Sequence, residues 1–171
     1  MILSENERFP KRIIPQPPPP WKTWEELMDL ALIEAEYSAS LNEVPVGAII
    51  VDKSGDILAK TGNRCISNND PTAHAEILAL REAAQRIKSY RLCECYLIVS
   101  LEPCLMCLSA IFNARLKGIV WGAKEPKTGA ISSRLNGFEL DCFLHDNIWE
   151  LGGIKEEKSE EILKVFFKKC R

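Results

Sequence analysis

The residues best suited to chemistry are one histidine, one glutamate and two cysteines. His74-Ala75-Glu76 is followed, 28 residues after the glutamate, by Cys104-Leu105-Met106-Cys107. One imidazole and two thiolates can hold a zinc ion on three sides and leave its fourth position open. An open position indicates chemistry on a zinc-activated water, whereas a structural zinc ion is closed by four protein ligands.

Glu76 is the candidate proton carrier of this site. Two thiolates cancel the two charges of zinc and neutral histidine adds none, so such a zinc ion polarises its water less than an all-histidine site would. A nearby base must then help to remove the proton, and Glu76 is the obvious candidate. The pattern H-x-E…P-C-x-x-C is typical of zinc-dependent nucleobase deaminases, in which this glutamate is the general acid and base.

A structural zinc site is the main alternative for these ligands. For a fourth ligand the sequence offers Cys65, Cys93, Cys95, Cys142, Cys170 and His145. A structural site has no need of a glutamate two residues after the histidine, so we favour the catalytic interpretation. The five other cysteines are expected to be small core residues, and His145 a surface or loop residue.

The two cysteines are expected in the first turn of a helix. Cys104 and Cys107 lie three residues apart, a spacing that places them on one helical face. Pro103, just before them, is typical of a helix start. In the first turn, the helix dipole and the free N–H groups favour the thiolate form that binds metal.

The histidine is expected at the entrance of a second helix. His74 and Glu76 are two residues apart, which is not a same-face spacing, so both can reach one site only where the chain is still turning into the helix. Asp70-Pro71, just upstream, predicts that entrance. Two helix N-termini are therefore expected to point at one zinc ion.

The rest of the chain predicts a layered α/β domain with a mixed sheet. Helices are expected over residues 24–40, 70–88, 103–114 and 159–169, and strands over residues 46–52, 57–62, 95–101, 117–121 and 148–151. Helices that alternate with strands after a β-hairpin indicate such layers. The last helix is expected to bury Ile162, Val165 and Phe166.

Length and composition fit one domain with a short N-terminal arm. Residues 1–20 hold six of the ten prolines and predict a flexible arm, which leaves residues 21–171 of the 171-residue chain as the domain. The N-terminal sequence lacks an apolar signal segment and no apolar run could span a bilayer, so we expect a cytoplasmic protein without a membrane partner. In that compartment the seven cysteines are expected to be reduced.

Charge alone does not indicate a nucleic-acid binder, because the formal net charge is −2. The last eight residues nevertheless hold four basic side chains and no acidic one. Such a cluster can bind phosphates, but cations also suit a solvated helix C-terminus. On this stretch alone, the solvated helix end is the favoured interpretation.

Longer motifs around the candidate site resemble the bacterial tRNA-specific adenosine deaminases. These motifs are residues 43–48, 62–64, 70–77, 101–107 and 127–129, and the resemblance covers about residues 21–170. The resemblance implies a three-layer α/β/α cytidine-deaminase-like fold with a mixed five-stranded sheet. It also implies a homodimer, one Zn²⁺ per subunit, and hydrolytic conversion of adenosine to inosine at the wobble position of a tRNA anticodon.

The resemblance assigns roles to individual residues. It implies that His74, Cys104 and Cys107 bind zinc and that Glu76 carries the proton. For substrate binding it implies Asn63 against the flipped purine, Pro45, Val46 and Ala75 in the pocket, Lys127 at an anticodon phosphate, and Phe166 and Phe167 on a helix that meets the anticodon loop. At least one of the two phenylalanines is also expected to pack in the core. Glu125 and His145-Asp146 depart from the family pattern.

Two alternative functions stay open at this point. A deaminase of a free base or nucleotide, such as guanine or deoxycytidylate, would share the zinc ligands and the glutamate; the residues around Glu102-Pro103-Cys104, the Lys127 loop and the basic C-terminus favour tRNA. A non-catalytic tRNA-binding subunit would be expected to lose the glutamate, and Glu76 is present.

Overall fold

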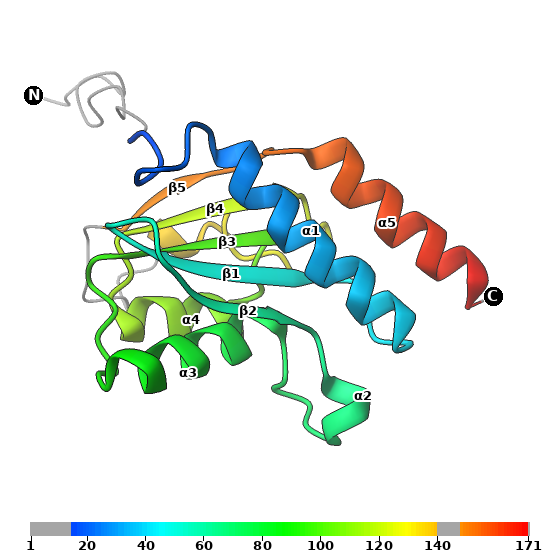
Figure 1. The fold of residues 1–171 in the computed structure, drawn as a ribbon. Helices are drawn as coiled ribbons and strands as arrows, with labels where there is room; N and C mark the ends of the chain where they lie inside the picture. The colour runs from blue at the N-terminus through cyan, green and yellow to red at the C-terminus, as the bar shows by residue number, and fades with distance from the viewer. Residues whose placement is uncertain (1–14, 140–147, 171) are drawn as a thin grey trace, which may run out of the picture.

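A computed structural model describes residues 15–139 and 148–170 of the chain (Figure 1). Its elements in chain order are α1 (Trp24–Ser40), β1 (Gly47–Asp52), β2 (Ile57–Gly62), α2 (Cys65–Asn68), α3 (Ala75–Ile87), β3 (Cys95–Leu101), α4 (Leu105–Ala114), β4 (Gly118–Ala123), the 3₁₀ turn η2 (Gly137–Glu139), β5 (Trp149–Leu151) and α5 (Glu156–Lys169). The predicted helices and strands are all present, and the short helix α2 was not predicted.

The five strands form one mixed sheet in the order β2-β1-β3-β4-β5. β1 is antiparallel to both β2 and β3, whereas the pairs β3–β4 and β4–β5 are parallel. Helices α3 and α4 cover one face of the sheet and helices α1 and α5 cover the other (Figure 1). The predicted three-layer α/β/α architecture is therefore confirmed.

The apolar strands reach the core on both faces of the sheet. In β1, Ala48 and Ile50 pack in the cluster shared with α3 and α4, whereas Ile49 and Val51 pack in the cluster shared with α1. This alternation follows from the two-residue period of a strand. Strands covered on both faces are apolar almost throughout, so their sequences read as continuous hydrophobic runs.

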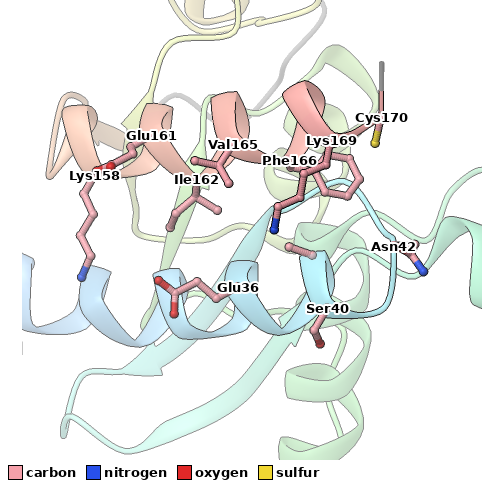
Figure 2. A pocket seen from close by; sticks show the side chains of 11 residues that line it. Glu36, Ser40, Asn42, Lys158, Glu161, Ile162, Val165, Phe166, Lys169 and Cys170 are labelled. Atoms are coloured by element: carbon pink, nitrogen blue, oxygen red, sulfur yellow. The ribbon is translucent and has the colours of Figure 1, made fainter.

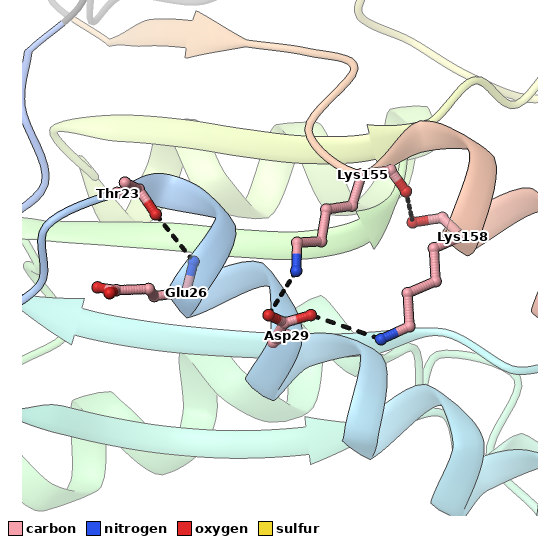
Figure 3. A network of polar contacts seen from close by, with 6 residues as sticks. Thr23, Glu26, Asp29, Lys155 and Lys158 are labelled. Atoms are coloured by element: carbon pink, nitrogen blue, oxygen red, sulfur yellow. Dashed lines mark hydrogen bonds and ion pairs between the residues drawn. The ribbon is translucent and has the colours of Figure 1, made fainter.

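The described part of the proline-rich segment is packed against the domain. Pro17 and Pro18 are buried. The indole N–H of Trp24 donates a hydrogen bond to the carbonyl of Pro15 at 2.9 Å. α1 then begins as predicted, with the Thr23 hydroxyl accepting a hydrogen bond from the backbone N–H of Glu26 (Figure 3). Residues 15–18 of the predicted arm therefore contact the domain, and residues 1–14 lie outside the described residues.

Helix α5 differs from its prediction in length and in burial. It begins at Glu156, three residues before the predicted start at Ser159, and Ser159 is its one buried residue among those described. The side chain of Val165 is 48% exposed, and Ile162 and Phe166 are only half-buried. Ile162 packs at the edge of the core cluster that contains α1, whereas Val165 and Phe166 lie outside both core clusters. The prediction of core packing is therefore wrong for Val165 and Phe166. None of the helices in the described ranges is long and apolar enough to cross a membrane.

Candidate active site

The structure brings the three predicted metal ligands together. The Nδ1 atom of His74 lies 3.7 Å from the Sγ atom of Cys104 and 3.5 Å from that of Cys107. Tetrahedral zinc, with bonds of about 2.0 Å to nitrogen and 2.3 Å to sulfur, would separate such atoms by about 3.6 Å. One imidazole and two thiolates at these distances therefore fit a zinc ion without rearrangement.

The metal cluster has three members among the residues that the structure describes. No fourth histidine, cysteine, aspartate or glutamate in residues 15–139 or 148–170 joins it, so these parts of the chain do not close the site. Cys142 and His145 lie outside the described residues. A cluster of three ligands leaves room for a water molecule, as catalytic zinc sites do.

Both halves of the motif stand at helix N-termini, as predicted. His74 is the N-cap of α3 and Cys104 is the N-cap of α4. Cys107 lies in the first turn of α4 and is fully buried. Hydrogen bonds from Cys107 and His74 lower the pKa of the Cys104 thiol to about 4, which favours its metal-binding thiolate.

The predicted helix boundaries are wrong by a few residues on the N-terminal side. Residues 70–73 form a turn instead of the first turn of α3, because the carboxylate of Asp70 accepts hydrogen bonds from the backbone N–H and the hydroxyl of Thr72. Such local bonds compete with helix formation. Pro103 likewise precedes α4, which begins at Leu105. The shorter helices place His74 and Cys104 directly at the helix ends.

A pocket of about 240 Å³ opens in front of the ligands. Five predicted site residues line it: Val46, Asn63, His74, Glu76 and Cys104. Eight lining residues received no predicted role in the site: Glu43, Val44, Cys65, Ile66, Leu101, Glu102, Glu125 and Thr128. Of the other predicted residues, Pro45 and Ala75 are buried and do not line the pocket, while Lys127 is exposed beside Thr128.

Four glutamates line the pocket, and for three of them hydrogen bonding and burial shift the pKa in different directions. Burial alone would raise the pKa of Glu43, but hydrogen bonds from Ser67 and Ile66 outweigh it and lower that pKa. Glu102 is likewise buried, and backbone N–H groups lower its pKa in the same way. These two groups are therefore held as permanent carboxylates. Glu76 differs, because burial raises its pKa, and a raised pKa suits a group that takes up and releases a proton.

Asn63 presents a defined end of its side-chain amide to the pocket. Its Oδ1 atom accepts the backbone N–H of Ala75 at 2.8 Å, and this donor fixes which end of the amide is oxygen. The guanidinium of Arg64 donates to the backbone carbonyl oxygen of Asn63 and to the hydroxyl of Ser38. The NH₂ group of Asn63 is thus the part that remains for a ligand, so the residue is set to donate a hydrogen bond.

A second hollow of about 680 Å³ lies between the C-terminal halves of α1 and α5 (Figure 2). Its lining includes Glu36, Ser40, Asn42, Ile162 and Phe166. Phe166 is half-buried and Phe167 is 49% exposed, so the prediction that one of them packs in the core is wrong. Asn42 lines this groove and the next residue, Glu43, lines the pocket, so the two hollows are neighbours across the α1–β1 loop.

The other described cysteines are free thiols outside the metal cluster. Cys95 is buried, as predicted for a core residue. Cys65 is half-buried at the pocket, and Cys93 and Cys170 are exposed. The prediction of core cysteines is therefore wrong for these three. Cys142 and the His145-Asp146 pair lie outside the described residues.

Comparisons with known proteins agree with this fold and site. The profile of the cytidine and deoxycytidylate deaminase zinc-binding region matches residues 22–123. The chain therefore belongs to the zinc-dependent cytidine and deoxycytidylate deaminase family. Within that family it belongs with the tRNA-specific adenosine deaminases, because it is 43% identical over 147 residues to the tRNA-specific adenosine deaminase of Haemophilus influenzae, covering 86% of this chain and 84% of that protein.

Two solved structures place the fold in the same family. A structure from biochemical and structural studies of A-to-I editing by tRNA:A34 deaminases superposes with a TM-score of 0.78 and 40% identity, covering 81% of this chain and 99% of that one. The guanine deaminase of Bacillus subtilis superposes with a TM-score of 0.58 and 36% identity, covering 67% of this chain and 72% of that one. The fold is thus shared by enzymes with different substrates.

Proposed function

We propose that this protein is a zinc-dependent tRNA adenosine deaminase that converts adenosine to inosine at the wobble position of a tRNA anticodon. The observation that carries the proposal is the three-ligand cluster with the buried carboxyl of Glu76 beside it, in a chain 43% identical to a tRNA-specific adenosine deaminase. His74, Cys104 and Cys107 would hold the zinc ion. When bound, the zinc ion supplies an activated water molecule to the pocket.

The protein side chains bind the base and move the protons. The NH₂ group of Asn63 donates a hydrogen bond to the purine, and Val46 forms part of the apolar wall. Glu76 takes a proton from water and delivers it to the ring, and a second proton goes to the departing amine. The water oxygen forms a bond to C6 of the purine and the bond from C6 to the amino nitrogen breaks, so water and adenosine become inosine and ammonia.

The size of the pocket suits a single base and not a whole nucleic-acid loop. Its 240 Å³ is smaller than the about 300–1,000 Å³ typical of pockets for larger ligands. The anticodon loop is single-stranded, so extruding one of its bases costs less than opening a duplex. The rest of the RNA would then lie on the surface around the pocket mouth.

Surface residues around the pocket suit an RNA loop. Lys127 is exposed next to Thr128 on the pocket wall, where its ammonium group can meet a phosphate. Phe166 and Phe167 stand edge to face, with ring centroids 5.4 Å apart, beside the neighbouring groove. Unpaired bases stack on such aromatic rings. We assign these three residues to contacts with the anticodon loop, in the cytoplasm where the tRNA substrate is found.

The outer surface of α3 and α4 is the proposed homodimer interface. It exposes Leu105 and Met106 at the start of α4, which are 43% and 36% exposed. It also holds a hollow of about 390 Å³ whose lining includes Ala84 and Tyr90. An apolar surface of this kind suits a second copy of the chain. The variant Ala84→Glu, in the wall of this hollow, should shift the protein to monomers in light scattering, whereas Ile33→Glu on α1 should not.

The decisive experiment compares two substrates. The zinc-loaded protein is incubated with an anticodon stem-loop whose first anticodon base is adenosine and, separately, with free guanine. Inosine in the RNA, with an equal yield of ammonia, supports the proposal, and Glu76→Gln is the inactive control. Ammonia from guanine alone would instead identify a free-base deaminase, the activity of the Bacillus subtilis relative. Binding of the stem-loop without turnover would identify a non-catalytic subunit.

A further inference from the structure

The carboxylate of Glu102 is enclosed by the loop that follows β4. One of its oxygens accepts the backbone N–H groups of Ile131, Ser132 and Ser133 at 3.0, 2.7 and 2.9 Å. The other accepts the backbone N–H of Glu125 at 3.1 Å and the hydroxyl of Ser133. Glu102 is only 2% exposed. Five donors from one loop therefore converge on a single buried anion.

The same loop is held tightly against the start of α4. Gly129 pairs with Cys104 in an isolated β-bridge, and the N–H of Ala130 donates to the carbonyl of Pro103 at 2.9 Å. A Cβ atom at Gly129 would lie 2.5 Å from a carboxylate oxygen of Glu102, so only glycine fits where the loop crosses this side chain. The position of the loop is thus set by its contacts with Glu102 and with the start of α4.

The loop carries two groups that face the substrate side. Thr128 lines the pocket, and Lys127 is exposed immediately before it. The backbone N–H of Lys127 is itself held by the side chain of Glu125, at 2.8 Å. Any shift of the segment between Glu125 and Ser133 would move both Lys127 and Thr128 relative to the metal ligands.

We propose that Glu102 is a positioning residue for the substrate RNA: its carboxylate fixes residues 125–133 in the shape that sets Thr128 on the pocket wall and Lys127 at the mouth. The inference rests on the proposed function, since Lys127 is assigned there to an RNA phosphate. Glu102 neither binds metal nor exchanges the proton, because its lone pairs are already filled by five donors.

Glu43, which also lines the pocket, provides a matched control. It is 1% exposed, and its carboxylate accepts the N–H groups of Ile66 and Ser67 and the hydroxyl of Ser67. It thus holds residues 65–68 as Glu102 holds residues 125–133. Glutamine at either position keeps the shape but turns an NH₂ group toward a backbone donor.

The first measurement compares amide hydrogen exchange in Glu102→Gln and Glu43→Gln, each with its zinc content checked. Glu102→Gln should speed exchange at residues 131–133 and leave residues 66–67 protected, and Glu43→Gln should do the reverse. A buried donor left without a partner is costly, so the local change should be at least about tenfold. General loosening of both loops in Glu102→Gln would overturn the proposal.

The second measurement is a double-mutant cycle on KM for the stem-loop. Lys127→Ala should raise KM in the wild type. In the Glu102→Gln background the fold-increase in KM caused by Lys127→Ala should be smaller by a factor of about three or more, because the lysine is already misplaced there. The kcat at saturating RNA should change little in Lys127→Ala, in Glu102→Gln and in the double variant. In the Glu43→Gln background Lys127→Ala should keep its full effect. Multiplicative effects of Glu102→Gln and Lys127→Ala would overturn the proposal.

A milder variant covers the case in which Glu102→Gln does not fold. Ser133→Ala removes one donor to Glu102 and leaves the carboxylate and the zinc ligands in place. Ser133→Ala should raise KM by a smaller factor than Glu102→Gln does, and its effect on KM should not multiply with that of Lys127→Ala. An unchanged KM in Ser133→Ala would overturn the proposal. Inosine formation by the wild type is measured first, so that failure of the proposed function is distinguished from failure of this inference.

Discussion

The two helical layers of the molecule are packed to different degrees. α3 and α4 each bury a row of apolar residues against the sheet, and both helices begin at the metal ligands. On the opposite face α1 is equally well packed, but α5 buries only Ser159 among its described residues. In Figure 1 the C-terminal end of α5 projects beyond the sheet, on the side where α2 lies.

This difference in packing matches two proposed tasks of the protein, which are proton transfer at the metal site and contact with an RNA loop. Groups that transfer protons must be held to within a fraction of an ångström, so they belong on elements fixed by dense packing. Contacts to an RNA loop tolerate more movement, and a lightly packed helix can supply them. We therefore expect changes in α3 and α4 to affect catalysis or stability, and changes in the C-terminal half of α5 to affect RNA binding.

The largest effect is expected at Glu76, in the first turn of α3. Glu76→Gln keeps the shape of the side chain but cannot carry the proton, so the rate of inosine formation should fall by about 10²- to 10⁴-fold. Zinc content, measured by atomic emission, should not change because the ligands are intact. Glu82→Gln, on the exposed side of the same helix, is the control. Full turnover by Glu76→Gln would remove this residue from the proton-transfer role.

The next largest effect concerns stability and compares one residue from each layer. Leu108 of α4 is fully buried, whereas Val165 of α5 is 48% exposed. Leu108→Ala should lower the free energy of unfolding by about 2–5 kcal/mol because it leaves a cavity. Val165→Ala should change it by no more than about 0.5 kcal/mol. Urea titrations of the two variants test the difference, and equal losses would contradict it.

The metal site was predictable because few arrangements satisfy its spacing. His74 and Glu76 can share a site only at a helix entrance, and Cys104 and Cys107 need one face of a helical turn. The buried strands were predictable for a similar reason, since strands covered on both faces are apolar throughout. In both cases local sequence carries the constraint.

What could not be predicted depends on contacts between distant segments. The helical spacing of Ile162, Val165 and Phe166 predicts an apolar face, but not that all three residues line a groove and that only Ile162 also contacts the core. Glu102 lies more than twenty residues from the loop that encloses it, so no local pattern reveals its five donors. The Asp70 turn shows a third case, in which a good helix-start signal forms a local turn instead.

A moderate effect on RNA binding is expected from the exposed aromatic residues of α5. Stacking of a base on an aromatic ring contributes about 1–3 kcal/mol, so Phe167→Ala should raise KM for the stem-loop by about fivefold or more. The kcat at saturating RNA and the melting temperature should stay close to wild type, because the ring is 49% exposed. Ile33→Ala, at an exposed apolar residue of α1, is the control. A fall in kcat without a change in KM would place Phe167 outside the RNA contact.

The smallest effect is expected where α5 is tied to α1. The carboxylate of Asp29 pairs with the ammonium group of Lys155 and, at 3.5 Å, with that of Lys158 (Figure 3). The hydrogen bond from Lys155 lowers the pKa of Asp29, so the pair stabilises the fold above the unfolded-state pKa of about 3.9 and this contribution is lost as the pH falls through the folded-state value.

Partial exposure keeps that contribution small, because the Asp29 side chain is 43% exposed and such pairs contribute at most about 1 kcal/mol. Asp29→Asn should therefore lower the melting temperature slightly at pH 7 and low salt. The difference from wild type should shrink as the pH falls below about 3.9, and also in about 1 M salt, where charges are screened. Thermal melts under these three conditions check it. A difference that persists in high salt would mean that the loss comes from packing at Asp29, and not from the ion pair.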